Sequence, residues 1–129
     1  MIAVDTNLLV RILTNDDPVQ ARRAVKILES DNIYIPKTVL LETEWVLRHA
    51  YKIGRSNIII GFQKLLGLPN VNVEDPDSIY QAISWYEDKF DFADALHLAS
   101  SRRCIRFATF DSFFIKKARQ FSSMDMIRP

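Results

Sequence analysis

Acidic side chains of this sequence stand at places where they could bind a metal ion. Asp5 follows the short apolar run Ile2–Val4 and precedes a longer, Leu-rich run, which predicts a buried strand that gives way to a helix. Near the other end, the apolar run Ile105–Phe110 leads directly into Asp111 and then into a helical pattern. Ligands bind at the carboxyl ends of strands in open parallel sheets, so we expect both carboxylates at one sheet edge. Asp5 could also act only as a helix cap.

Two further carboxylates begin a helix that the apolar pattern predicts over residues 91–103. Asp91 and Asp94 are three positions apart, one helical turn, and could face a cation together. They also resemble a capping box and suit the positive end of the helix dipole. In the helix predicted over residues 37–51, Glu42 and Glu44 flank the apolar stripe on opposite sides. Periodicity does not choose which glutamate points toward the sheet edge.

A cluster of carboxylates needs a counter-ion, because like charges held close together force some groups to keep their protons. All-oxygen ligands favour Mg²⁺ or Mn²⁺ over zinc, with one ion or two. Such a site activates water and neutralises charge on an attacked phosphate, which is the chemistry of phosphodiester hydrolysis. The sequence offers no other chemistry: it has no phosphate-binding G-x-x-x-x-G-K loop, no G-x-S-x-G elbow and no Cys/His pair.

The elements that position these acids alternate along the chain. Alternating strands and helices predict a parallel sheet with helices on both faces and right-handed crossovers. We therefore expect an α/β fold, a three-layer α/β/α sandwich with a central sheet of about five short strands. A length of 129 residues fits a single domain, residues 1–129. The predicted strands are 2–4, 33–35, 71–73, 105–110 and 124–127. A first helix is predicted to begin near residue 8, and the further predicted helices are 18–29, 37–51, 57–66 (capped by Ser56), 76–88, 91–103 and 112–120.

Composition narrows the class of protein. An apolar content of 48% can build a core, and a net charge of +1 argues against a general DNA binder. The single cysteine, Cys104, cannot form an internal disulfide, which favours a reducing cytoplasm. No stretch approaches the roughly 20 apolar residues of a membrane span. Leu41 and Trp45 point away from their helix's apolar stripe, either as scattered surface residues or as a surface for another chain.

Four motifs together resemble the PIN domain family in its VapC-type toxin branch. They are VDTNLL, LLETEW, DFADALHLA and TFD, which occur in the family's order and span the chain. The resemblance implies an α/β/α fold and a Mg²⁺- or Mn²⁺-dependent ribonuclease. It also implies a homodimer that is neutralised by a small antitoxin, in a type II toxin–antitoxin system.

The resemblance also implies roles for individual residues. It selects Glu42 over Glu44, and it leaves Asp91 as a cap, a further ligand or a supporting acid. Basic residues at the site edge would steer the RNA backbone. The implied metal-binding and catalytic acids are Asp5, Glu42, Asp94 and Asp111, and Thr6, Asn7 and Thr109 would hydrogen-bond to them. Apart from the resemblance, the candidates for steering are Arg11, Lys37 and Arg48, any of which could instead be solvated surface.

Two other functions compete with the nuclease. A phosphatase with an N-terminal aspartate nucleophile needs a second acid two positions later, where this chain has Asn7. A non-catalytic PIN-like interaction module would use the acids only as caps, and metal would add no stability to it. The nuclease explains the whole set of carboxylates.

Overall fold

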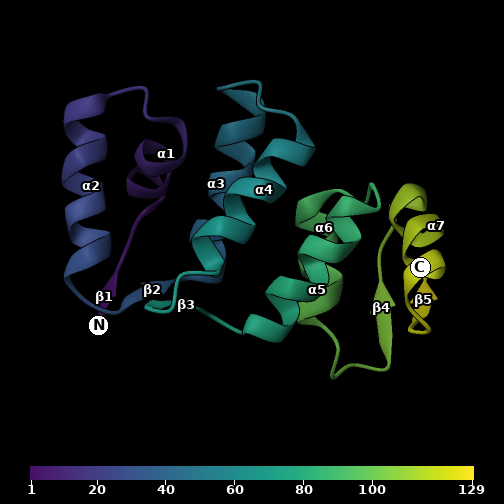
Figure 1. Cartoon of the computed structure of the whole chain (residues 1–129). Coiled ribbons are helices and arrows are strands. Elements are labelled where there is room, and N and C mark those ends of the chain that lie inside the picture. Colours follow the sequence, from purple (N-terminus) through teal and green to yellow (C-terminus); the bar gives the residue numbers. More distant parts are fainter. The chain divides into compact units, whose positions relative to one another are not determined.

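The computed structural model describes the whole chain, Met1–Pro129, which divides into two compact units, Met1–Pro76 and Asp77–Pro129. The order of strands and helices is the one expected from the sequence, with seven helices and five strands (Figure 1). All strand pairs are parallel. The strands pair as a group of three in the first unit and a group of two in the second.

The first unit is built on the parallel sheet β1-β2-β3. Ile33, at the start of the middle strand, is opposite Ile2 on one side and Val71 on the other, and it is fully buried. Its core is completed by apolar faces of the helices, such as Leu9 and Leu40. The elements are β1 (Ile2–Ala3), α1 (Thr6–Thr14), α2 (Pro18–Ser30), β2 (Ile33–Ile35), α3 (Lys37–His49), α4 (Arg55–Leu66) and β3 (Val71–Val73).

The second unit has an aromatic core. The ring of Phe114 lies 4.8 Å from that of Phe107 and 5.6 Å from that of Phe90, and the rings of Tyr86 and Phe92 are 5.1 Å apart. The apolar faces of its first two helices are buried. The elements are α5 (Pro76–Glu87), α6 (Phe92–Ser100), β4 (Arg106–Ala108), α7 (Ser112–Phe121) and β5 (Asp125–Ile127), with β4 paired to β5.

Three details differ from the sequence-based expectations. Ser56 does not cap α4, because Gly54 occupies the N-cap position and no side chain bonds there. The helix predicted over residues 91–103 already ends at Ser100. The run Ile105–Phe110 is not a continuously buried strand: only its middle forms β4, and its two ends are 84% and 71% exposed. An apolar run alone does not determine burial, which depends on the neighbours that cover a strand.

No helix has both the length and the apolar character needed to cross a membrane. Cys104 is a free, exposed thiol, as expected.

Candidate active site

Asp5 lies at the junction between β1 and α1, two residues after the end of the strand and directly before the first residue of the helix. It is the N-cap of α1, and its Oδ1 accepts a hydrogen bond from the backbone N–H of Thr6 over 2.7 Å. The carboxylate is nevertheless exposed. The capping role predicted for Asp5 is therefore confirmed, and it leaves a carboxylate at the surface that can also bind a ligand.

Thr6 connects Asp5 to the acidic residue of α3. Its side chain is buried, and its hydroxyl donates a hydrogen bond to Oε1 of Glu42. One threonine thus holds both acids, the first by its backbone and the second by its side chain. This confirms the hydrogen-bonding role expected for Thr6. Around these groups lies a pocket of about 430 Å³, lined among others by Asp5, Thr6, Asn7, Arg11, Glu42 and Tyr51.

The two glutamates of α3 have different surroundings. The side chain of Glu44 is 1% exposed and forms an ion pair with Arg48 on the same helix, with Nε 2.7 Å from Oε2. Glu42 is exposed and faces Thr6 instead. Helical periodicity could not choose between Glu42 and Glu44, because it places them on opposite flanks of the helix but does not indicate which residues each flank contacts.

Asp91 and Asp94 stand at the start of α6. Asp91 is the N-cap, and its Oδ2 accepts from the backbone N–H of Asp94 over 3.1 Å. Asp94 is half-buried, and its pKa is raised, first by burial and then by the negative charges of Asp91 and Asp111; the nearby His97 opposes this only in part. The second unit therefore brings three carboxylates close enough to repel one another.

Asp111 is held rigidly at the start of α7. Its Oδ1 accepts from the backbone N–H groups of Phe113 and Phe114, over 2.9 and 3.1 Å. Its own N–H donates to the Thr109 hydroxyl over 3.0 Å, so Thr109 fixes the backbone of this acid. Thr109 was expected to hydrogen-bond to an acid, and its hydroxyl does so with the backbone N–H of Asp111 instead of the carboxylate. Asn7 lines the pocket at Asp5, and its hydrogen bond to an acid stays a prediction.

The basic residues expected to steer RNA are engaged in ion pairs. Lys37 lies 3.0 Å from Asp75, and Arg48 pairs with Glu44. Arg11 contacts Asp16 over 3.2 Å and donates to Gln20 over 2.7 Å. These contacts reduce the positive charge that each side chain offers to a phosphate.

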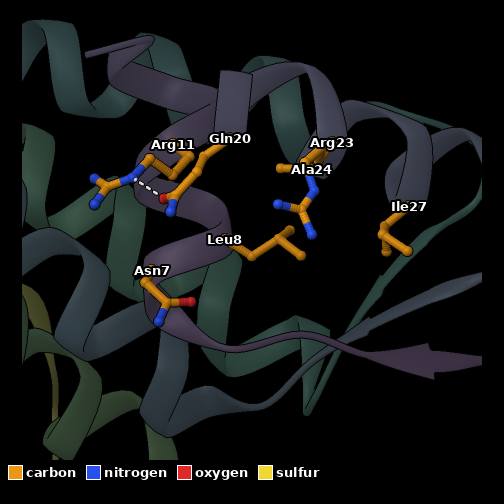
Figure 2. Close-up of a pocket in the computed structure, with 7 residues that line it drawn as sticks. All are labelled: Asn7, Leu8, Arg11, Gln20, Arg23, Ala24 and Ile27. Carbon is orange, nitrogen blue, oxygen red and sulfur yellow. Dashed lines mark hydrogen bonds between the residues drawn. The ribbon is translucent and has the colours of Figure 1, made fainter. Parts of the chain in front are cut away.

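A second hollow, of about 550 Å³, lies between α1 and α2. Figure 2 shows the guanidinium of Arg23 of α2 extended toward Leu8 of α1, and the hydrogen bond from Arg11 of α1 to Gln20 of α2. Asn7 and Arg11 line this hollow and the pocket at Asp5 alike. Sequence reasoning did not single out Arg23 or the pocket residue Tyr51, and no spacing signal marks either one.

Comparison with known families decides the classification. The family model of the PIN domain matches residues 2–120, nearly the whole chain. This chain belongs to the PIN domain family. The matched range includes every acid described above.

A solved structure of another protein is similar to this PIN domain at low sequence identity. A solved structure of VapC20 from Mycobacterium tuberculosis, described as a toxin that cleaves the sarcin–ricin loop, is 23% identical. The match covers 90% of this chain and 94% of that one, with a TM-score of 0.45. Comparison with curated proteins finds no matching sequence.

The donor atoms of this PIN domain fit a hard divalent cation. All candidate ligands are carboxylate oxygens, which Mg²⁺ and Mn²⁺ prefer. The raised pKa of Asp94 shows that its site disfavours one more negative charge, a situation that a bound cation would reverse. Within either unit alone, no group of three or more acidic, histidine or cysteine side chains is arranged to hold a metal ion.

Proposed function

We propose that this PIN domain is a metal-dependent ribonuclease that hydrolyses phosphodiester bonds in RNA, and that it is the toxin of a type II toxin–antitoxin pair. The observation that carries the proposal is the crowding of Asp94 by Asp91 and Asp111 in a member of the PIN family. Mutual repulsion among acids costs stability, and a site that tolerates it is a candidate for function.

In this proposal, Asp5, Glu42, Asp94 and Asp111 are the acids that hold one or two Mg²⁺ or Mn²⁺ ions. A bound ion of this kind supplies an activated water and neutralises charge on the attacked phosphate. Asp91 acts as a positioning residue, because it caps α6 through the backbone of Asp94.

The chain's own contribution is to hold these oxygens in place. Thr6 orients Asp5 and Glu42, and two backbone N–H groups fix Asp111. Ligands that are held by neighbouring hydrogen bonds need no reordering when the ion and substrate bind. The same contacts leave at least one oxygen of each carboxylate available to a cation.

The experiment is cleavage of a panel of structured and single-stranded RNAs by the purified protein, with Mg²⁺, with Mn²⁺ and with EDTA. An Asp5→Asn variant is run in parallel, and we expect cleavage that requires metal and disappears in the variant. Cleavage that persists in Asp5→Asn would come from a contaminating nuclease. No cleavage of any RNA, together with no metal-dependent rise in melting temperature, would contradict the proposal.

A non-catalytic interaction module is the second candidate, and one observation favours it. Asp5, Asp91 and Asp111 all cap helices, which is a sufficient structural reason for each of them. Capping does not account for Glu42, which lies inside α3. A module of this kind would bind its partner equally well with and without EDTA. The phosphatase is less favoured still, because Asn7 stands at the position of its second acid.

The proposed partners are a small antitoxin and a second copy of the chain, in the cytoplasm. Trp45 is 56% exposed and packs on His49, with ring centroids 4.7 Å apart, while Leu41 beside it is half-buried. An exposed tryptophan is a common anchor at protein interfaces. A Leu41→Glu, Trp45→Glu variant should lose antitoxin binding, and full binding by this variant would remove these two residues from the interface.

A further inference from the structure

Helix α7 presents an exposed aromatic ring beside the acids of the second unit. Phe113, in its first turn, is 86% exposed, whereas the next residue, Phe114, is buried in the core. Phe113 lines a pocket of about 440 Å³ together with Asp91 and Asp94. A ring with this much exposure contributes little to the core, so its place beside the carboxylates calls for another explanation.

Positive charge continues from this ring along the same helix. Lys116 lines the pocket at Asp94 and also a second hollow, of about 540 Å³, with Arg119 and Arg128. No acidic side chain lines that second hollow. Lys116 is exposed and forms no ion pair, whereas Lys117 is held over the ring of Phe121, 5.6 Å from its centroid.

Helical geometry aligns these groups. Phe113, Lys116 and Gln120 are spaced by three and four positions, so they lie on one face of α7, one turn after another. The row therefore runs from the carboxylates along α7, with the aromatic ring nearest the acids. We call Phe113, Lys116, Gln120, Arg119 and Arg128 the α7 strip.

An exposed ring followed by cations that form no ion pair is the arrangement that binds single-stranded nucleic acid, in which bases stack on aromatic side chains and cations follow the backbone. A protein-binding surface would instead have a centre depleted of charged residues. The charge of the α7 strip therefore favours RNA over a protein partner.

We propose that the α7 strip binds the RNA substrate as a single strand: an unpaired base stacks on Phe113, and the adjoining phosphates contact Lys116, Arg119 and Arg128. This inference rests on the proposed ribonuclease function, and it adds to it the residues that bind the strand. RNA in which the base next to the cleaved bond is unpaired is then the preferred substrate.

The test is binding and cleavage by a Phe113→Ala variant, with Tyr80→Ala as its matched control. Tyr80 is a 54% exposed aromatic residue of α5 that lines none of these pockets. Binding is measured in EDTA, where no cleavage occurs, by the anisotropy of a labelled unstructured RNA that carries 2-aminopurine, whose fluorescence falls on stacking. Phe113→Ala should bind roughly tenfold or more weakly and lose the quenching, because a stacked base contributes that much. Tyr80→Ala should match the unmodified protein.

Lys116→Gln tests the phosphate contact separately, with Arg22→Gln as control, an exposed cation of α2 that forms no ion pair. Lys116→Gln should weaken binding to all sequences and reduce the slope of log affinity against log salt by about 0.7, the value for one phosphate on a single strand. Arg22→Gln should leave the slope unchanged.

The outcomes separate this inference from the proposed function. If the unmodified protein cleaves RNA with metal and Phe113→Ala equals it in binding, quenching and rate, the proposed role of the α7 strip in RNA binding is wrong. The proposed nuclease function would then remain. Neither binding nor cleavage of any RNA by the unmodified protein would overturn both. Loss of antitoxin binding in Phe113→Ala, with RNA binding unchanged, would make Phe113 part of a protein interface and would also overturn the inference.

Discussion

The two units hold their acids in different electrostatic surroundings. In the first unit, Asp5 and Glu42 both accept hydrogen bonds from Thr6. In the second unit, Asp94 is half-buried, and the neighbours that act most on its pKa are two other carboxylates. One set of acids is positioned by donors, and the other is crowded by like charge.

This difference indicates which unit depends more on a cation. The hydrogen bonds from Thr6 hold the acids of the first unit in place without metal. No hydrogen bond to the Asp94 carboxylate offsets its burial and the charges of Asp91 and Asp111. The charged form of Asp94 therefore gains most from a bound ion. If the comparison is correct, changes in the second unit should alter metal-dependent stability, and changes in the first should mainly alter ligand geometry.

The largest expected effect is that of Asp94→Asn. Removal of this carboxylate should lower the metal-dependent cleavage rate about a hundredfold or more, since a metal ligand supports several kcal/mol of transition-state stabilisation. In EDTA the same variant should be more stable than the unmodified protein, because the repulsion with Asp91 and Asp111 is gone. Cleavage assays and urea unfolding with and without Mg²⁺ measure the two effects. A variant that is less stable in EDTA would contradict the comparison.

The second prediction concerns the glutamate that does not face the pocket. Arg48→Met should lower the free energy of unfolding by about 3 kcal/mol, because it removes the ion-pair partner of a carboxylate that is 1% exposed. Glu44→Gln, Arg48→Met should recover part of this loss, and it should retain metal-dependent cleavage. Urea unfolding measures the stability. Loss of cleavage in the double variant at full stability would move Glu44 into the active site in place of Glu42.

The third prediction tests the hydrogen bond between the first unit's acids. Thr6→Val removes the hydroxyl that donates to Glu42, but it keeps the backbone N–H that donates to Asp5. Loss of a hydrogen bond that orients a ligand typically costs 10- to 100-fold in metal affinity, and we expect a loss of about that size. Thr6→Ser is the matched control and should bind metal normally in a Mn²⁺ titration. Equal affinity in both variants would show that Glu42 needs no orientation by Thr6.

The order of the elements could be predicted from the sequence because each depends on local signals. Asp17 before Pro18 begins α2, and the apolar stripes of α5 and α6 give their buried faces directly. The bond from Thr6 to Glu42 joins residues 36 positions apart, so it depends on how α1 packs against α3. No local pattern encodes that packing.

The exposure of side chains was harder to predict than their secondary structure. Phe110 and Ile105 flank β4 in an apolar run, yet both are exposed. Phe113 and Phe114 are neighbours of the same type with opposite burial, as helical rotation requires. The sequence stretch TFDSFFIKKAR contained the signal for the α7 strip, an aromatic residue followed by cations, but not which of its two phenylalanines is exposed.

The smallest expected effect is on the pH dependence of stability in EDTA. The pKa of Asp94 is raised above its ordinary value of 3.8, so the folded protein binds a proton there more tightly than the unfolded chain does. The free energy of unfolding should therefore fall as the pH rises from just below 3.8 through the raised pKa, and then level off, because the slope follows the excess of protons in the folded state. Asp94→Asn should lose this part of the slope, as measured by urea unfolding at a series of pH values. Saturating Mg²⁺ should also reduce it in the unmodified protein, since the ion favours the deprotonated carboxylate. An identical slope in the unmodified protein and in Asp94→Asn would mean that the crowding of the second unit's acids has no energetic consequence, and the contrast between the two units would then be one of geometry alone.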